Sequence, residues 1–285
     1  MLKYLIIPLA NDSVSFCHYS KGDKSNELIS IDCLKEAIFW AMKENLNIQF
    51  IYPDYEIPDE YKNVINTIDH ISIISSVCED DSLRNDAEII VFDSWASLNL
   101  YQFRNDVSYV IRCTKDDFFE NVRFLNIILP NIERLVIVFT DIETFKENDF
   151  EKYALILDSL IPLVKEEYKK GHSVHFNLLT DRMFLDKMNN CNAGVESITL
   201  APDGEFYICP AFYLDGLKSV GNLKNGLNIK NQQLYRLDHA PICRICDAFQ
   251  CHRCTWLNKK TTLEVNTPSH EQCVIAVSYT HLTLP

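Results

Sequence analysis

Short apolar runs alternate with longer amphipathic segments over roughly the first 190 residues. The runs are rich in Ile, Val and Phe, as expected for strands that are covered on both faces. They predict strands at Tyr4–Leu9, Ile48–Tyr52, Ile71–Ile74, Glu88–Phe92, Tyr109–Arg112, Leu135–Thr140 and Val174–Leu179. Each run is short enough to cross a sheet once, so a sheet at the core of this part is expected.

Helical spacing of apolar residues marks the segments between several of these strands. Helices are expected over 30–45, Lys115–Ile127 and Asp149–Lys169. In the first helix, Ser30 or Asp32 is the capping residue, and Leu34, Ile38 and Met42 share one face. The order of strands and helices predicts a parallel α/β sheet or a partial barrel, and a doubly wound sheet has the same periodicity.

A change of pattern near residue 190 opens a second part. Ser197–Ala201 and Glu205–Cys209 flank a Pro-Asp-Gly turn at 202–204, which predicts a hairpin. Cys191 and Cys209 lie at the two ends of this hairpin unit. We therefore expect the hairpin to bring these two cysteines toward each other.

Composition limits the classes of function. The chain has 47% hydrophobic residues and a formal net charge of −13. That charge repels phosphate backbones, so no nucleic-acid partner is expected. No stretch approaches the ~20 apolar residues of a membrane span. Met1–Ala10 is interrupted by Pro8 and lacks a small-residue cleavage site, so it is expected to be a buried strand of a cytoplasmic protein and not a signal peptide.

The cysteines are unevenly distributed. Four of the eleven are scattered singly, at Cys17, Cys33, Cys78 and Cys113. The other seven lie close together, at Cys191, Cys209, Cys243, Cys246, Cys251, Cys254 and Cys273. In a reducing compartment, clustered cysteines indicate metal binding or catalysis instead of disulfides.

The spacing within the run Cys243–Cys254 bears on which metal is bound. Two Cys-x-x-Cys pairs are separated by only four residues, whereas the two pairs of a zinc ribbon are usually much further apart. A run shared between two sites, each completed by distant cysteines, relieves this crowding. Two iron–sulfur clusters need up to eight thiolates. The alternatives are one structural zinc with spare cysteines, or unrelated buried cysteines.

The cysteine pattern with Gly204 resembles the SPASM domain, which accompanies radical S-adenosylmethionine (SAM) enzymes that modify peptides. The resemblance implies two auxiliary [4Fe-4S] clusters. It assigns the first cluster to Cys191, Cys209 and Cys254, which leaves one position open. It assigns the second to Cys243, Cys246, Cys251 and Cys273. The central run is slightly shorter here than the common family spacing.

The α/β part is compatible with a radical SAM partial barrel but lacks its motifs. The Cys-x3-Cys-x2-Cys motif that binds SAM should follow the first strand, where 13–20 contain only Cys17. The Gly-Gly-Glu stretch expected after the second strand is replaced by Tyr52–Glu56. No glycine lies between Gly22 and Gly171, which excludes Rossmann and P-loop phosphate sites there. No SAM-binding or catalytic residue is assigned, and cleavage of SAM by this chain alone is not expected.

Along most of its length the chain resembles the CXXX repeat peptide maturases, SPASM proteins linked to ribosomally synthesised peptides with a cysteine at every fourth residue. The resemblance rests on residues 4–7, 16–19, 178–182, 191–194, 243–256 and 266–273. It implies a peptide maturase, or its redox or recognition subunit, acting on a cysteine-rich precursor peptide. A radical SAM enzyme or an electron donor is the further partner expected. The alternatives are a non-catalytic module that binds a peptide or partner, and a structural zinc protein.

Three segments are therefore expected: an α/β partial barrel at 1–190, a SPASM-like domain at 191–276, and a tail at 277–285. The tail looks like a translated sequencing-adapter sequence. We expect the native sequence to be interrupted near Ile275, only a few residues after Cys273.

Overall fold

The computed structural model describes residues 1–23, 25–98 and 101–278, so 279–285 of the expected tail lie outside the described residues. The chain divides into two compact units. The first comprises Met1–Ile89 and Asn192–Ala240, and the second comprises Ile90–Cys191 and Pro241–Pro285. One crossing between the units falls beside Cys191, close to the change of pattern in the sequence. The segment 191–276 is divided between the units.

The first unit is built on parallel strands. Its strands are β1 (Tyr4–Pro8), β2 (Asn47–Ile51), β3 (His70–Ser75), β8 (Ser197–Leu200) and β9 (Phe206–Tyr207), in the order β3-β2-β1-β8-β9. β1 pairs in parallel with both β2 and β8, whereas β8 and β9 are antiparallel. The antiparallel pair confirms the predicted hairpin, and Gly204 in its turn has a positive φ of 82° that glycine adopts without strain.

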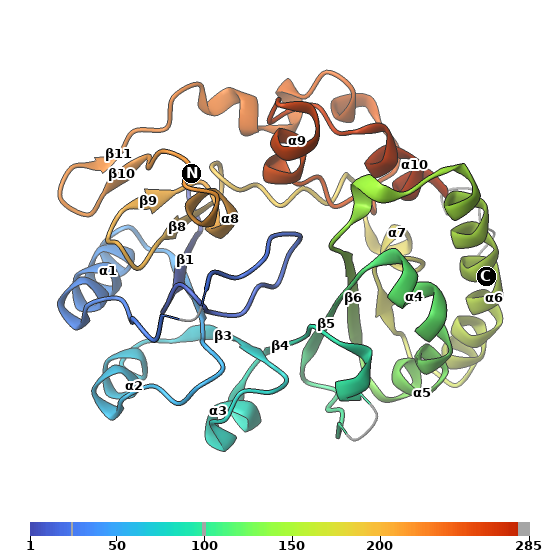
Figure 1. Cartoon of the computed structure of the whole chain (residues 1–285), viewed down its shortest axis with the longest axis horizontal. Coiled ribbons are helices and arrows are strands. Elements are labelled where there is room, and N and C mark those ends of the chain that lie inside the picture. The colour runs from blue at the N-terminus through green and yellow to red at the C-terminus, as the bar shows by residue number, and fades with distance from the viewer. Residues whose placement is uncertain (24, 99–100, 279–285) are drawn as a thin grey trace. The chain divides into compact units, whose positions relative to one another are not determined.

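Helices of the first unit cover these strands. They are α1 (Ile31–Lys43), α2 (Asp59–Ile65), α3 (Asp81–Asp86) and α8 (Pro210–Leu214), and β10 (Gly221–Asn222) pairs with β11 (Gly226–Leu227). α1 and α2 lie beside each other along these strands (Figure 1). Ser30 caps α1 by accepting a hydrogen bond from the backbone amide of Cys33, as expected.

One residue of the face predicted for α1, Met42, is not buried. Leu34 and Ile38 are buried, but Met42 is 62% exposed. The small side chains Ala37 and Ala41 are fully buried instead. The buried stripe therefore shifts toward the alanines, because they allow the helix backbone to approach the sheet closely.

The second unit has the same alternation of strand and helix. Its strands are β4 (Ile89–Phe92), β5 (Ser108–Cys113), β6 (Arg134–Phe139) and β7 (His175–Phe176), in the order β7-β6-β5-β4. Its helices are α4 (Lys115–Asn121), α5 (Leu125–Ile128), α6 (Glu147–Lys169), α7 (Asp181–Phe184), α9 (Thr255–Thr262) and α10 (His270–Ser278). β6 pairs in parallel with β5 and β7, which confirms the predicted α/β class.

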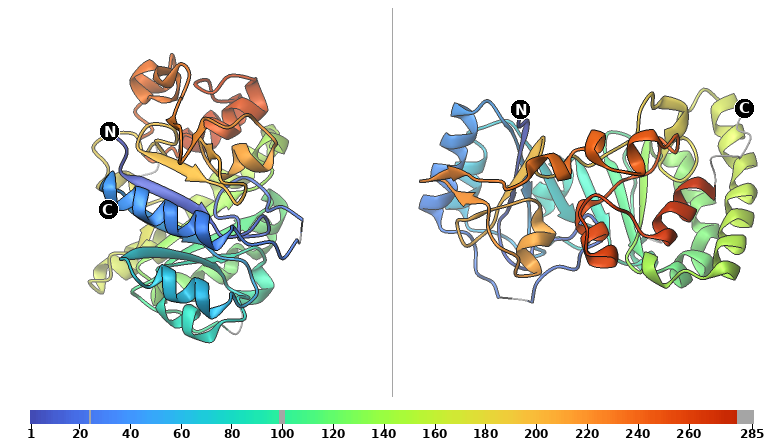
Figure 2. Two further views of the ribbon diagram at one scale, coloured as in Figure 1. Left: turned by 90° about the vertical axis from the view of Figure 1, so that its left-hand side faces the viewer. Right: turned by 90° about the horizontal axis from the view of Figure 1, so that it is seen from above.

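The helices α4, α5 and α6 lie on one side of β5 and β6 (Figure 1). Aromatic rings fill the space between them, with Phe139 at 5.3 Å from Phe118 and 5.8 Å from Tyr153, centroid to centroid. α10 packs against α6 (Figure 2). This contact brings the helix that carries Cys273 onto the α/β frame of the same unit.

Two predicted elements of this unit are shorter than expected. The strand at 174–179 pairs only over His175–Phe176, because the Thr180 hydroxyl donates to the Val174 carbonyl at 2.9 Å and turns the chain. The helix over Lys115–Ile127 ends at Asn121 and continues as a 3-10 turn over Val122–Phe124. Among the described residues, no helix is both long and apolar enough to cross a membrane.

A pair of leucines on α6 tests this packing. Leu157 is fully buried, whereas Leu155 on the same helix is 70% exposed. We expect Leu157→Ala to lower the free energy of unfolding by about 2–5 kcal/mol, because it removes buried apolar contacts and leaves a cavity. Leu155→Ala should cost no more than about 0.5 kcal/mol. Urea titrations followed by circular dichroism measure both, and equal losses would contradict the placement of α6.

Candidate metal centre

Four of the seven clustered cysteines lie together in the second unit. Burial raises the pKa of Cys251 to about 12, and the nearby thiols of Cys243, Cys273 and Cys246 raise it further. Burial likewise raises the pKa of Cys273, with Cys243 and Cys246 adding to the rise. Burial is the larger cause of both shifts, and the smaller contributions of the thiols indicate that the four side chains lie near one another. We call them the four-thiol site.

The first two thiols are presented by a tight turn. Cys243–Ile245 form a 3-10 turn, in which the Cys246 amide donates to the Cys243 carbonyl at 3.2 Å. The Ala248 amide then donates to Cys246 Sγ at 3.5 Å. This hydrogen bond fixes the Cys246 side chain beside the turn.

Cys273 is positioned by the start of α10. Ser269 and Gln272 form a reciprocal capping pair: the Ser269 amide donates to Gln272 Oε1 at 2.7 Å, and the Gln272 amide to Ser269 Oγ at 3.4 Å. Gln272 Nε2 also donates to Asn258 Oδ1 at 3.2 Å. Asn258 is fully buried in α9. This contact fixes α10, and with it Cys273, against α9.

A second set of polar contacts holds the loop before Cys251. Gln250 is 2% exposed, and its Nε2 donates to the Ala276 carbonyl at 2.7 Å. Arg182 donates to the Asp247 carbonyl at 2.6 Å. The neighbouring residue Asp181, 3% exposed, accepts two hydrogen bonds from Arg134 at 2.8 and 3.0 Å. The loop is thereby tied to α7 and, through Asp181, to β6.

The remaining three cysteines are not brought together by any contact described above. Cys191 is exposed, and Cys254 caps α9 by accepting from the Leu257 amide at 3.4 Å. Both belong to the second unit, whereas Cys209 belongs to the first. Their assignment to one cluster stays a prediction. Among the described residues, no three or more His, Cys, Asp or Glu side chains are arranged as an ion-binding group.

The loop after β1 is a packed segment. Asp12, Ser13, Val14 and Ser15 are each at most 5% exposed. Ser13 Oγ accepts from the Ala10 amide at 2.9 Å, and the Val14 amide donates to the Tyr52 carbonyl at 3.0 Å. The loop offers Cys17 as its single thiol. Its donor set therefore does not fit a three-cysteine cluster of the kind that binds SAM.

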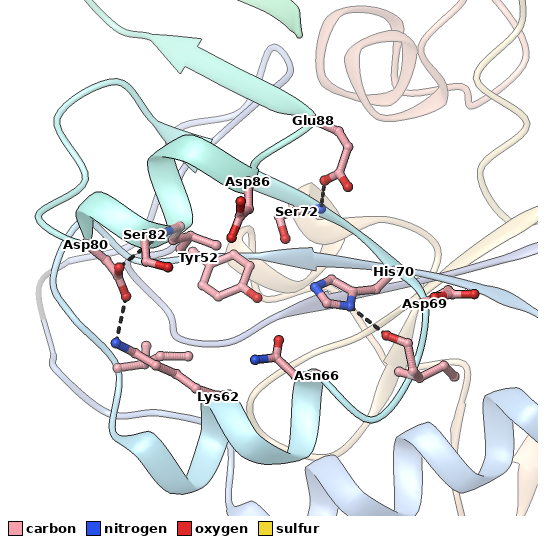
Figure 3. Close-up of a pocket in the computed structure, with 13 residues that line it drawn as sticks. Tyr52, Lys62, Asn66, Asp69, His70, Ser72, Asp80, Ser82, Asp86 and Glu88 are labelled. Carbon is pink, nitrogen blue, oxygen red and sulfur yellow. Dashed lines mark hydrogen bonds and ion pairs between the residues drawn. The ribbon is translucent and has the colours of Figure 1, made fainter. Parts of the chain in front are cut away.

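The first unit also contains a cavity of about 560 Å³ between α2 and α3. Tyr52, Asn66, His70 and Ser72 lie around it, with Asp86 at its edge (Figure 3). Burial raises the pKa of Tyr52 to about 12. No cysteine lines this cavity, so it is separate from the four-thiol site.

Several polar groups of this cavity are engaged with one another. Lys62 pairs with Asp80 at 2.8 Å, and the Ser72 amide donates to Glu88 at 2.7 Å (Figure 3). Burial alone would raise the pKa of Asp80, but Lys62 and the Leu83 amide outweigh burial and lower it. These contacts hold α2 and α3 against β3.

Comparison with solved structures shows the same fold in two proteins. The structure of anSMEcpe with bound AdoMet, which is SAM, has a TM-score of 0.64 and 13% identity, covering 98% of this chain and 96% of that chain. Its complex with AdoMet and the Cp18Cys peptide gives 0.61 and 14%, over 98% and 96%. Streptococcus suis SuiB bound to precursor peptide SuiA gives 0.50 and 12%, over 96% and 76%. At these identities the likeness establishes the fold alone. No protein-family model and no curated protein sequence matches the chain.

The Arg134–Asp181 contact tests how the thiol-bearing loop is held. We expect Asp181→Asn to lower the free energy of unfolding by about 1.5–3 kcal/mol, because it weakens a two-bond contact to a buried carboxylate. Asp238 makes a similar contact with Arg236 but is exposed. Asp238→Asn should therefore lower the free energy of unfolding much less than Asp181→Asn does, because solvent screens an exposed pair. Urea titration of both variants measures the difference, and an equal effect would show that burial of Asp181 does not matter.

Proposed function

We propose that this chain is an iron–sulfur protein that takes part in the maturation of a ribosomally synthesised, cysteine-rich precursor peptide. It would act as a SPASM-type maturase or as its redox or recognition subunit. Its four-thiol site would hold one [4Fe-4S] cluster, and Cys191, Cys209 and Cys254 would hold a second. A radical SAM enzyme or an electron donor is the partner that this role requires.

The observation that carries the proposal is the gathering of Cys243, Cys246, Cys251 and Cys273. A set of four cysteine thiolates is a ligand set for a [4Fe-4S] cluster. The four come from a turn, a loop and a helix, and buried hydrogen bonds hold the loop and the helix. When a cluster is bound at such ligands, it supplies one-electron transfer. The chain's own contribution would be to hold the thiols in place.

The fold supports a peptide as the substrate class. The chain shares its fold, over 96–98% of its length, with proteins whose structures contain AdoMet or a peptide. Function cannot be inferred from fold alone, because one fold supports many activities. The cysteine spacing is an independent reason to expect peptide maturation, since it resembles SPASM proteins that act on peptides.

A second candidate function is a binding module without chemistry of its own. The packed loop after β1 favours it, because that loop has one thiol where three are needed to bind a SAM-cleaving cluster. In this role the four-thiol site would stabilise the fold, and the chain would recognise a peptide or a partner enzyme. Zinc at the four-thiol site is the form of this alternative that carries no redox activity.

Metal analysis separates these functions. After anaerobic purification we expect about eight irons and eight sulfides per chain, as two [4Fe-4S] clusters require. Cys251→Ser should lower both to about half, because it removes one ligand of a single cluster. Cys33→Ser is the matched control, since Cys33 is also half-buried but lies in α1 of the first unit. Stoichiometric zinc without sulfide would refute the iron–sulfur proposal.

Incubation with SAM and a strong reductant tests the missing motif. We expect no 5′-deoxyadenosine from this chain alone, because Cys17 is the single thiol of the loop after β1. Chromatography of the quenched reaction measures the product, with a known radical SAM enzyme as positive control. Formation of 5′-deoxyadenosine by the chain alone, and its loss in Cys17→Ser, would overturn this reading of the loop.

A further inference from the structure

The cavity between α2 and α3 is large enough for part of a ligand molecule, and the proposed function makes no use of it. Its volume of about 560 Å³ lies within the roughly 300–1,000 Å³ of typical ligand sites. Every residue that lines it lies between Tyr52 and Glu88, so the cavity belongs to the first unit alone. Its size is many times that needed for one water molecule.

Two buried side chains, Tyr52 and Ser72, bring polar groups to this cavity. They are 4% and 5% exposed. Tyr52 directs its hydroxyl into the cavity, toward Asn66 and His70 (Figure 3). Burial raises the pKa of Tyr52 to about 12, and a hydrogen bond from Ser72 opposes this rise. No residue that lines the cavity accepts the proton of the Tyr52 hydroxyl in Figure 3, so this buried hydroxyl can still donate to a ligand.

Negative charge is in excess around the cavity. Lys62 lines it, but this lysine is already paired with Asp80 at 2.8 Å and with a second carboxylate at 2.6 Å. Three further carboxylates line the cavity and are exposed: Asp69, Asp86 and Glu88. Within the described parts of the chain, none of these three forms an ion pair. Their charge is therefore available to a cation that enters the cavity.

The positions of the acidic groups favour an organic cation over a metal ion. Among the described residues, no three His, Cys, Asp or Glu side chains are gathered as an ion-binding group. The carboxylates of Asp69 and Asp86 instead lie apart (Figure 3). A guanidinium has five N–H donors in a planar fork and can reach more than one carboxylate, whereas an ammonium is a compact point charge. Nδ1 of His70 donates to the Ile68 carbonyl at 2.8 Å, which leaves Nε2 of the neutral ring as a further acceptor.

We propose that this cavity binds an arginine residue of a peptide. The guanidinium faces the carboxylates, and a carbonyl of the same peptide accepts the proton of the Tyr52 hydroxyl. Both groups are needed to match the cavity, because a simple guanidinium offers Tyr52 no acceptor and a neutral peptide leaves the carboxylates without a cation. The inference goes beyond the proposed function, since it requires neither a cluster nor a maturation reaction.

The test is a titration of the full, isotope-labelled chain with the peptide acetyl-Gly-Arg-Gly-amide, followed by nuclear magnetic resonance. We expect the backbone amide signals of Asn66, His70 and Ser72 to shift, because these residues line the cavity. The same peptide with citrulline in place of arginine keeps the shape but loses the charge. It should bind at least about tenfold more weakly, since hydrogen bonds to charged groups are lost. Butylguanidine is the probe that has the guanidinium but no carbonyl.

Two matched pairs of variants locate the site. Asp86→Asn should weaken binding of the arginine peptide about three- to fivefold, because it removes one carboxylate of the cavity. Asp81→Asn is its control and should stay within about twofold, since Asp81 is exposed on the same helix but does not line the cavity.

Tyr52→Phe should weaken binding of the arginine peptide about fivefold and leave binding of butylguanidine unchanged, because it removes only the hydroxyl donor. Tyr61→Phe is the control. The Tyr61 hydroxyl donates to the Ile29 carbonyl at 2.7 Å, and Tyr61 does not line the cavity.

Each contrary outcome has a distinct meaning. Equal binding of the arginine and citrulline peptides, or signal shifts away from the cavity, would overturn the inference. So would equal losses in Asp86→Asn and Asp81→Asn, because binding would then follow the net charge of the chain. Butylguanidine binding as tightly as the peptide would refute the contact between Tyr52 and the peptide carbonyl, and with it the choice of a peptide. If Tyr52→Phe does not fold, the two aspartate variants decide. Absence of iron and sulfide from the wild type would refute the proposed function and leave this inference standing.

Discussion

Buried side-chain hydrogen bonds, instead of regular secondary structure, hold the thiols of the second unit together. Between residue 241 and the start of α9 the chain forms a 3-10 turn, loops and one isolated bridge of Arg253 with Asn190, so no continuous ladder of backbone hydrogen bonds fixes it. Gln250 lies in this segment, whereas Asn258 and Gln272 lie on the helices α9 and α10 that follow it, and each of the three is at most 8% exposed. A buried amide side chain costs free energy unless its hydrogen bonds are made. Each of the three has a defined hydrogen-bond partner.

This arrangement explains why the cysteines can be gathered from distant positions in the sequence. Cys273 reaches the four-thiol site because α10 is held twice, by Gln272 against α9 and by Gln250 at the Ala276 carbonyl. The helix also packs on α6, which belongs to the α/β part of the same unit. The cysteine-rich segment of this unit is therefore supported by the frame of strands and helices, and the stability of α6 bears on the geometry of the site.

The strand pattern could be predicted from sequence because buried parallel strands are nearly continuous apolar runs. The predicted run at 135–140 and the observed β6 differ by one residue at each end. The prediction that Met42 is buried was wrong, because periodicity cannot tell which apolar residue faces the sheet when alanines lie on the same side of the helix. Seven cysteines identified the candidate site, but Arg253, Asn258 and Gln272 resemble surface residues in sequence. Only the Ser-x-x-Gln pattern at 269–272 carried a local signal, that of a helix start. The positions of the other polar groups depend on tertiary contacts.

The loop after β1 and the four-thiol site differ in how many of the expected cysteines they contain. The loop after β1 is filled by its own buried side chains and by hydrogen bonds such as Val14 to Tyr52, so it is stable without a cluster. The four-thiol site is different, because burial and the neighbouring thiols raise the pKa of Cys251 and work against forming the thiolate. The fold supplies the same scaffold to both regions, and they differ in the number of cysteines that the sequence places there.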